Sequence, residues 1–404
     1  MIFDVTKLPF FSHIKYLESK KKCKVYFVGG IVRDFLLNRT IKDIDIVVFN
    51  ISYIEFATGL ARLLSKNIIA FKDNIRIVIG EITIDISKPK GSNIYRDLGC
   101  RDFTINSLAL TTDGKLIGNI EDINKKLIRI NYDNTFLDDP LRILRAFRFA
   151  AEINFNIDNN TFKKIKELKH LLLDIASERI YNELYKTFTA KYFNLIIDIF
   201  IDSEVFISLL KVDNVNKKNI NNTEKRLLYN LFKVSDLQYY KKNDKFILII
   251  ITLIIPFIYV QNFNINHLKK FIIVKKIYTL IKKTINTFKK LDKNLKKCDL
   301  YFIIYNNYSV INYVVTILNV SRETFNGDYN ILYKRVRDAI KSIDINRASL
   351  INGNDLKLLG IKESKVFGKL LNEVKYKLAF GMIESKKAAI EYIKKRAKNE
   401  TFTF

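Results

Sequence analysis

Two aspartates, Asp43 and Asp45, stand two residues apart at the start of an apolar run, IDIVVFN at 44–50. Side chains two apart on a strand point to the same side, so the pattern predicts two carboxylates on one face. Like charges this close are unfavourable unless a cation neutralises them, and Mg²⁺ prefers carboxylate oxygens together with substrate phosphates. Alone, the pair is more typical of solvated aspartates at a strand edge.

An anion-binding turn is predicted just before this pair. Gly29 and Gly30 end the apolar run KVYFVGG at 24–30, and residues 31–37 have the character of a helix start. Glycines let the backbone turn so that its N–H groups and the helix N-terminus face an anion. Arg33, one turn into the helix, would add a positive charge. Together these residues indicate a triphosphate site.

A third acid, Asp85, lies in a predicted hairpin made by 75–80 and 81–87, with Gly80 near its turn. Three carboxylates beside a phosphate cradle match two-metal phosphoryl transfer. One metal lowers the pKa of an attacking hydroxyl and the other stabilises the leaving pyrophosphate. Mg²⁺ is therefore the predicted cofactor.

A second polar block, RDFTINSLAL at 101–110, places Arg101 and Asp102 before an alternating apolar segment. This segment is predicted to be a strand, with Asn106 inside it. Arginine suits phosphate or ribose contacts. Buried Asp–Arg pairs are just as often structural, and the residues alone leave both interpretations open.

A basic helix is predicted from DDPLRILRAFRFAAEINF at 138–155, with Asp139 as N-cap and Pro140 at the first helical position. Arg142, Arg145 and Arg148 follow at three-residue steps. Three arginines on a helix that also carries large apolar side chains suggest an anionic or base-edge partner. The alternative is a simple cap followed by solvated arginines.

Composition limits the class of protein. The 404 residues carry 69 Lys+Arg against 42 Asp+Glu, a net charge of +27 that would attract a polyanion such as nucleic acid. Lysine enrichment through AT-rich coding is an equally good source of this charge. The three scattered cysteines favour a reducing cytoplasm over a disulfide or zinc framework. The N-terminus lacks the layout of a secretory signal, and the apolar run at 246–260 is too short to span a membrane.

The predicted architecture is an α/β head followed by a helical body, because strand patterns fade after about residue 135. A single long helix is predicted over 267–297, with lysine pairs at 269/270, 275/276, 282/283, 289/290 and 296/297. Its apolar face would carry Phe271, Val274, Ile281, Ile285 and Phe288. The lysines form either a solvated face or a stripe along a phosphate backbone.

In their order along the chain, VGGIVRDFLL, DIDIV, RDFTINSLAL and DDPLRILRAFRFAAEINFNID resemble the class II tRNA nucleotidyltransferases, or CCA-adding enzymes, and the related bacterial poly(A) polymerases. SERIYNELYKTF at 177–188 continues the resemblance, and INGNDLKLLGIKESKVFGKLL at 351–371 is similar to the C-terminal tail pattern of the tRNA-maturing branch.

The resemblance implies an α+β fold: a polymerase-β-like head with a mixed sheet at 1–132, a helical neck at 133–195 and a helical body and tail at 196–404. It assigns the metal-binding carboxylates to Asp43 and Asp45, the third catalytic carboxylate to Asp85, and the triphosphate site to Gly29, Gly30 and Arg33. Nucleotide contacts are assigned to Arg101, Asp102, Asn106, Asp139, Arg142, Arg145 and Arg148. Within this set Asp139 and Arg142 would read the base edge, with Arg145 and Arg148 supporting the helix and the phosphates.

The implied activity is the transfer of CMP, and AMP in the full CCA reaction, from CTP and ATP to the 3′ end of tRNA. The connection from Asp85 to Arg101 is shorter than in many CCA-adding relatives, and Cys100 stands where the family often has a basic residue. A short loop resembles members that add only CC and leave adenosine to a separate A-adding enzyme. The alternatives are a poly(A) polymerase and a non-catalytic RNA-binding protein.

Overall fold

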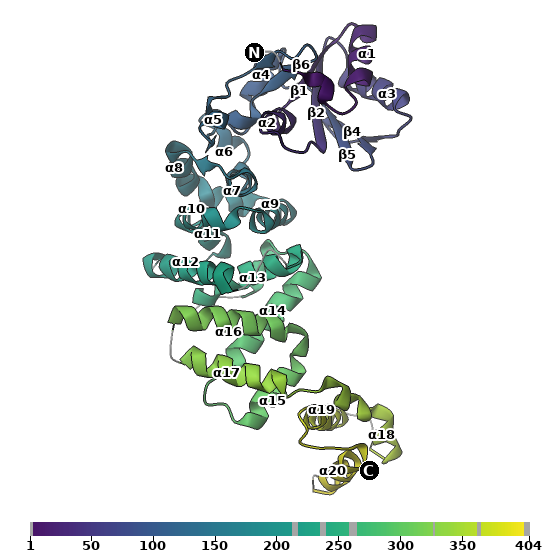
Figure 1. Ribbon diagram of the computed structural model, residues 1–404, viewed down its shortest axis with the longest axis vertical. Helices are drawn as coiled ribbons and strands as arrows, with labels where there is room; N and C mark the ends of the chain where they lie inside the picture. Colours follow the sequence, from purple (N-terminus) through teal and green to yellow (C-terminus); the bar gives the residue numbers. More distant parts are fainter. Residues whose placement is uncertain are drawn as a thin grey trace. The chain divides into compact units, whose positions relative to one another are not determined.

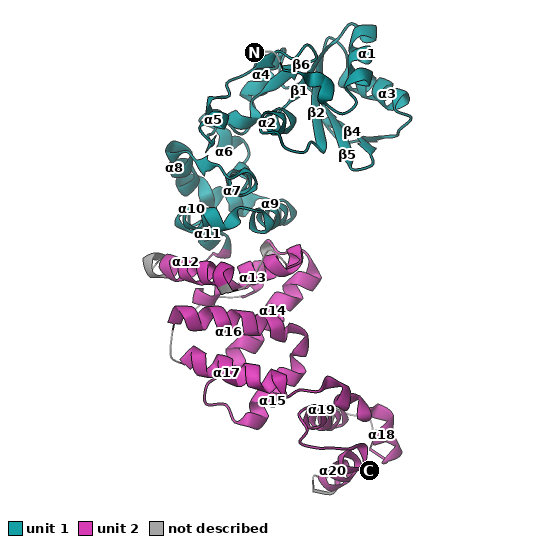
Figure 2. Ribbon diagram, in the orientation of Figure 1, with its two compact units in different colours: residues 1–209 teal, residues 210–404 magenta. Residues whose placement is uncertain are grey.

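The computed structural model describes residues 3–211, 217–234, 240–257, 265–325, 328–361 and 365–399. The chain divides into two compact units, residues 1–209 and 210–404 (Figure 2). Unit 1 holds every strand of the described residues, and unit 2 is helical throughout its described part. The predicted α+β class, with a mixed-sheet head followed by a helical region, is confirmed.

The head of unit 1 is built on a seven-stranded sheet in the order β3-β4-β5-β2-β1-β6-β7 (Figure 1). The strands are β1 (Lys24–Val28), β2 (Asp43–Phe49), β3 (Ile68–Ala70), β4 (Asn74–Ile79), β5 (Ile82–Ser87), β6 (Ala109–Thr111) and β7 (Leu116–Ile117). The β2–β5 pair is parallel, and the other neighbours are antiparallel. The predicted hairpin is β4–β5, and Gly80 in its turn has φ +60°.

One face of this sheet is apolar because of alternation along the strands. Ile44, Ile46 and Val48 of β2 are fully buried. The helices α1 (Phe11–Lys21) and α3 (Tyr53–Leu63) pack on the sheet. The intervening residues of β2 point to the other face, where Val47 packs with α4 (Ile94–Gly99) and β6. Asp43 and Asp45 share that second face.

The second polar block differs from its predicted strand. Asn106 ends a short 3₁₀ turn, Thr104–Asn106, and the strand β6 begins only at Ala109. Buried polar groups need hydrogen-bond partners, and this turn aims the Asn106 side chain at Arg33 and Asp102 rather than into a strand ladder.

Unit 1 also holds the short elements α2 (Gly30–Leu36), α5 (Glu121–Asn124), β8 (Leu127–Ile128) and α6 (Thr135–Asp138), of which α6 falls inside the predicted neck, 133–195. Unit 1 continues with α7 (Arg142–Ile153), β9 (Asn156–Ile157), α8 (Asn159–Leu168), α9 (Ser177–Thr189), α10 (Ile197–Asp202) and α11 (Val205–Leu210). An all-helical neck is wrong in one detail, because β9 pairs in parallel with β8.

The basic helix also begins later than predicted. Its first residue is Arg142, and Leu141 occupies the N-cap position. Asp139 lies in an extended conformation and accepts a hydrogen bond from the Leu141 backbone N–H at 3.1 Å. Asp139 therefore shapes the entry to α7 as a local turn rather than as its cap.

Unit 2 consists of α12 (Lys217–Val234), α13 (Lys242–Ile254), α14 (Lys275–Lys290), α15 (Lys297–Asn306), α16 (Ile311–Phe325), α17 (Asp328–Lys341), α18 (Gly353–Leu358), α19 (Lys365–Ala379) and α20 (Lys386–Asn399). The single long helix predicted over 267–297 is wrong. A 3₁₀ segment at 265–270, then α14 and α15, replace it. Of its predicted apolar face, four residues are buried and Val274 is exposed.

The run at 246–260 is a buried core segment up to Phe257, as predicted, and its last three residues lie outside the described part. No helix among the described residues combines the length and apolar character needed to cross a membrane.

Candidate active site

A pocket of about 540 Å³ opens within unit 1, between the second face of the sheet and the neck helices. Basic side chains outnumber acidic ones in its lining, seven to five, which favours an anion. It is lined by Gly29, Gly30, Ile31, Arg33, Asp34, Arg39, Thr40, Lys42, Asp43, Asp45, Arg101, Asp102, Asn106, Arg145, Arg148, Phe149, Glu152 and Lys186. Most of the sequence-predicted site residues are brought together here; Asp85, Asp139 and Arg142 are not in the lining.

The carboxylate pair lies at the start of β2, with Asp43 exposed and Asp45 half-buried. Within the described residues neither carboxylate forms a hydrogen bond or ion pair. Burial raises the pKa of Asp45 to about 6, with Arg101 opposing this and the charges of Asp85 and Asp43 adding to it. Two carboxylates on one face, neither of them hydrogen-bonded or ion-paired in the described residues, are a donor set that suits a divalent cation.

The Gly29–Gly30 turn lies close to the side chains of Arg101 and Arg33. Gly29 has φ +73°, and a Cβ there would lie 2.6 Å from Nη1 of Arg101. A Cβ at Gly30 would lie 3.6 Å from Nη2 of Arg33 and 3.9 Å from Oδ2 of Asp45. The turn thus brings the start of α2, two guanidinium groups and the carboxylate pair against the same small volume.

A chain of buried hydrogen bonds ties Arg33 to the neck. Its Nη1 donates to Oδ1 of Asn106 at 2.7 Å, and Nδ2 of Asn106 donates to Oδ1 of Asp102 at 3.0 Å. Asp102 then accepts from Nε of Arg145 at 2.8 Å. Burial raises the pKa of Asp102, but the Arg145 charge and the Asn106 hydrogen bond outweigh it and leave the pKa below its usual value.

Glu183 on α9 holds the neck arginines. It ion-pairs with Nε of Arg148 at 3.3 Å and with Nη1 of Arg145 at 4.0 Å. Burial and the neighbouring Arg145 charge lower the pKa of Arg148, whereas Asp102 and Glu183 raise that of Arg145 against its burial. The guanidinium groups are therefore fixed in place by acids rather than solvated.

Three arginine guanidinium groups lie within cation–π distance of the Phe149 ring. The guanidinium carbons of Arg33, Arg145 and Arg148 lie 5.0, 5.3 and 4.4 Å from its centroid. The negative face of an aromatic ring attracts cations at this range, so Phe149 helps to hold the three guanidinium groups near one another. The result is a preformed positive wall opposite the carboxylate pair.

The predicted base-reading residues are engaged by the protein itself. Oδ2 of Asp139 accepts from Nη2 of Arg179 at 2.8 Å. Nη1 of Arg142 donates to the Tyr132 hydroxyl at 2.7 Å, and its Nη2 donates to the carbonyl of Cys100 at 3.2 Å. Both side chains are partly exposed beside the pocket rather than in its lining.

Several participants were missed by sequence reasoning. Glu183 lies in the segment 177–188 that carries the family resemblance, and its place in that segment was the available signal in the sequence. Asp97 holds Arg101 through Nε and Nη2 at 3.2 and 2.9 Å, four residues away on α4. Phe149 reads in the sequence as an ordinary core residue, and Arg76 as an ordinary strand residue.

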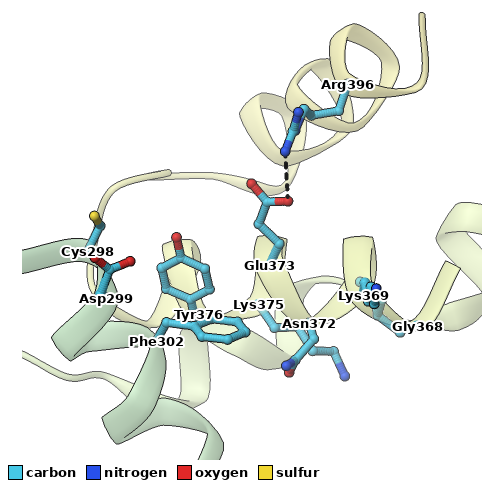
Figure 3. A pocket seen from close by; sticks show the side chains of 11 residues that line it. Cys298, Asp299, Phe302, Gly368, Lys369, Asn372, Glu373, Lys375, Tyr376 and Arg396 are labelled. Atoms are coloured by element: carbon cyan, nitrogen blue, oxygen red, sulfur yellow. Dashed lines mark ion pairs between the residues drawn. The ribbon is translucent and has the colours of Figure 1, made fainter. Parts of the chain in front are cut away.

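A larger pocket, about 790 Å³, lies in unit 2 among α15, α19 and α20 (Figure 3). Glu373 points into it and ion-pairs with Arg396 at 3.6 Å, while it also accepts from the Tyr392 hydroxyl at 2.6 Å. The rings of Phe302 and Tyr376 meet edge to face at 5.0 Å. This pocket holds no counterpart of the Asp43–Asp45 pair.

Comparison with known proteins identifies the head. Residues 25–129 match the family described as the poly A polymerase head domain. The matched segment holds the glycine turn, the Asp43–Asp45 pair and Arg101. Residues 154–212 match the family described as a probable RNA and SrmB-binding site of polymerase A. Nucleotidyltransferase enzymes need divalent metals. Residues 130–153, with Asp139 and Arg142, lie between the two matches.

Curated relatives match about half of the chain. A CCA-adding enzyme of Streptococcus uberis is 34% identical over 225 residues, covering 50% of this chain and 55% of the relative. A CC-adding tRNA nucleotidyltransferase of Halalkalibacterium halodurans is 36% identical over 165 residues, covering 40% and 43%. An A-adding tRNA nucleotidyltransferase of Aquifex aeolicus is 31% identical over 238 residues, covering 53% and 28%. The matches span about half or less of each relative's length.

Solved structures agree over almost the whole chain. A CCA-adding enzyme complexed with CTP has a TM-score of 0.74 at 23% identity, covering 100% of this chain and 97% of that one. The Thermotoga maritima CCA-adding enzyme complexed with tRNA has a TM-score of 0.70 at 23% identity, covering 98% and 97%. At this identity the agreement establishes the fold of the chain.

Proposed function

We propose that this protein is a tRNA nucleotidyltransferase that adds CMP from CTP to the 3′ end of tRNA without a nucleic-acid template. The observation that carries the proposal is the meeting, in one pocket, of several arginines held by acids and a carboxylate pair that forms no hydrogen bond or ion pair within the described residues. The arginines would bind a triphosphate directly, and a divalent cation held by the carboxylates would neutralise the repulsion between them and the phosphates. The names of the relatives, which include CCA-, CC- and A-adding enzymes, support tRNA as the acceptor.

The chain's own residues bind and orient the nucleotide. Backbone N–H groups at the Gly29–Gly30 turn and the Arg33 guanidinium would hold the triphosphate. Asp102 and Asn106 keep Arg33 and Arg145 at fixed positions, so their charge requires no reorganisation when negative charge develops on the leaving pyrophosphate.

Asp43 and Asp45 are proposed to hold Mg²⁺. When bound, the metal lowers the pKa of the attacking 3′ hydroxyl and stabilises the leaving group. The raised pKa of Asp45 fits such a role, because a cation would relieve the burial and the neighbouring negative charge that raise it.

Base selection is proposed for Asp139 and Arg142. Carboxylate and guanidinium offer an acceptor and donors, which suit the edges of cytosine and adenine. In the proposed reaction these two side chains must give up part of their contacts with Arg179 and Tyr132. The Arg142→Ala variant is expected to lose roughly tenfold or more in discrimination between nucleotides, about 1.4 kcal/mol, with little change in tRNA affinity. Unchanged selectivity would count against this role.

The basic helical body is proposed to bind the acceptor tRNA. Lys275, Lys276, Lys289 and Lys290 are exposed on α14, opposite its buried face. Phosphate contacts by such lysines make binding weaken with salt. A cytoplasmic location belongs to the same proposal, and the three free cysteines fit a reducing compartment.

The decisive experiment is incubation of the protein with Mg²⁺, labelled CTP or ATP, and a tRNA that lacks its 3′ terminus. Addition of two cytidines is expected. A further adenosine would identify full CCA addition. A halt after CC would identify the CC-adding subtype that the short connection between Asp85 and Arg101 favours.

Two other outcomes identify the remaining candidates. Long adenosine tails would make the protein a poly(A) polymerase. Incorporation of neither nucleotide, with tRNA still bound, would leave a non-catalytic RNA-binding protein and overturn the proposal.

A further inference from the structure

Lys186 on α9 differs from the other basic residues that line the pocket of unit 1. Six of the seven basic side chains in this lining form an ion pair with an acid of the protein. The six pairs are Arg33–Asp34, Arg39–Asp34, Lys42–Glu81, Arg101–Asp97, Arg145–Asp102 and Arg148–Glu183. Lys186 is exposed and forms no hydrogen bond or ion pair within the described residues. Its charge is therefore not offset by any acid in the described part of the chain.

Lys186 lies toward the C-terminal end of α9, away from the proposed base-reading residues. Helices α7 and α9 pack against each other, and the contacts follow the same order along both. Arg179 of α9 contacts Asp139 just before α7, and Glu183 contacts Arg148 further along. The two helices therefore run in the same direction. Lys186 follows Arg179 by seven residues, which is a rise of about 10 Å along the helix.

The arginines expected to bind the phosphates lie between these two ends. The guanidinium carbons of Arg33 and Arg148 lie 5.0 and 4.4 Å from the centroid of the Phe149 ring. Lys186 is about one helical turn beyond the acid that holds Arg148. A nucleotide whose base is read at Asp139 and whose triphosphate is held by Arg33 therefore extends its terminal phosphate toward Lys186.

We propose that Lys186 binds the terminal phosphate of the incoming nucleotide and then the pyrophosphate that leaves. The inference rests on the proposed function, in which the β- and γ-phosphates leave together as pyrophosphate. It assigns a phosphate contact to the segment 177–188, for which the sequence predicted no nucleotide contact.

The ion pairs give the physical reason. Each pocket arginine must share its charge between a phosphate and the acid that already holds it, whereas Lys186 has no such internal partner to lose. A lysine ammonium is a compact point charge with three rotatable donors on a flexible stem. It can therefore follow pyrophosphate as it leaves, which a guanidinium fixed by a buried acid cannot do.

The test measures binding of CTP, CMP and inorganic pyrophosphate to the full chain by isothermal titration calorimetry, with Mg²⁺ and without tRNA. Lys186→Gln is expected to lose about tenfold in affinity for CTP and for pyrophosphate, about 1.4 kcal/mol. Its affinity for CMP, measured by competition with CTP, should stay within about twofold of the wild type, because CMP lacks the terminal phosphates. Lys186→Arg, which keeps the charge, should stay within about threefold for CTP.

The matched control is Lys163→Gln, which removes an exposed lysine of α8 that lies outside the pocket lining. It should change none of the three affinities. Circular dichroism checks that each variant is folded.

Two results would overturn the proposal: a Lys186→Gln variant that binds CTP as tightly as the wild type, or one that loses affinity for CTP and CMP equally. The binding measurement requires no nucleotide transfer, so it is separate from the proposed function. Weaker CTP binding in Lys186→Gln, together with a wild type that incorporates no nucleotide, would contradict the proposed function and leave the phosphate contact standing. Normal incorporation with unchanged CTP affinity in Lys186→Gln would contradict only the phosphate contact.

Discussion

The pocket of unit 1 and the pocket of unit 2 differ in how their charges are satisfied. The second is larger, about 790 Å³ against 540 Å³, and its Glu373 is held by Arg396 and Tyr392. In the first, arginines are fixed by buried acids while Asp43 and Asp45 stay without a partner. Size therefore does not mark the candidate site. The marker is a carboxylate pair without a hydrogen bond or ion pair in the described residues, next to arginines that buried acids hold in place.

The largest expected effect is a loss of nucleotide incorporation on changing Asp43 in the pocket of unit 1. Asp43→Ala should reduce nucleotide incorporation about 10³-fold or more, roughly 4 kcal/mol of transition-state stabilisation, because it removes a metal ligand. Binding of tRNA, measured by filter retention, should be unchanged. Retained incorporation would remove Asp43 from the metal site.

A second effect tests whether the arginine wall is preformed. Glu183→Gln leaves Arg148 without its buried acid, and breaking such a pair costs about 3 kcal/mol of unfolding free energy. Urea unfolding measures this loss. Glu373→Gln in the pocket of unit 2 is the comparison, because Glu373 is half-buried and its ion pair is long. If Glu183→Gln and Glu373→Gln lost the same unfolding free energy, the ion pairs of the two pockets would contribute equally to stability, against this prediction.

A third effect concerns a carboxyl buried in unit 2. Burial raises the pKa of Glu224 well above its usual value. Below the unfolded pKa near 4.5, Glu224 is protonated in both the folded and the unfolded chain, and the free energy of unfolding is at its full value. As the pH rises from there toward the folded pKa, the unfolded chain ionises first and the free energy of unfolding falls. The loss is about 1.4 kcal/mol per pH unit in that window. Glu224→Gln should abolish this slope in denaturation from pH 5 to 8, whereas Glu178→Gln, at an exposed acid, should keep it.

The smallest expected effect is in the pocket of unit 2. Lys375→Gln should leave kcat for CMP incorporation within about twofold of the wild type, a difference below 0.5 kcal/mol. Steady-state kinetics with saturating tRNA would check it. A loss comparable to that of Asp43→Ala would erase the contrast between the two pockets.

Much of the head followed from local pattern. The strands β1, β2, β4 and β5, the helix start after Gly30 and the hairpin at Gly80 were predicted, because alternation and glycine turns are properties of adjacent residues. The errors fell where tertiary contacts override pattern. Asn106 is drawn out of a strand by Arg33 and Asp102, and the predicted helix over 267–297 is broken before α14 and again before α15.

The sequence by itself determined that Asp43 and Asp45 share one face of a strand and that a glycine turn with Arg33 lies next to them. It also carried the motifs that resemble the nucleotidyltransferases. Only the tertiary structure decided which charged side chains have an ion-pair partner. Strand register sets Arg76 against Asp85, and the packing of α7 and α9 sets Glu183 against Arg148. Such partners are distant in sequence or on other elements, and a hydrogen bond depends on positions within a few tenths of an ångström that no local pattern encodes.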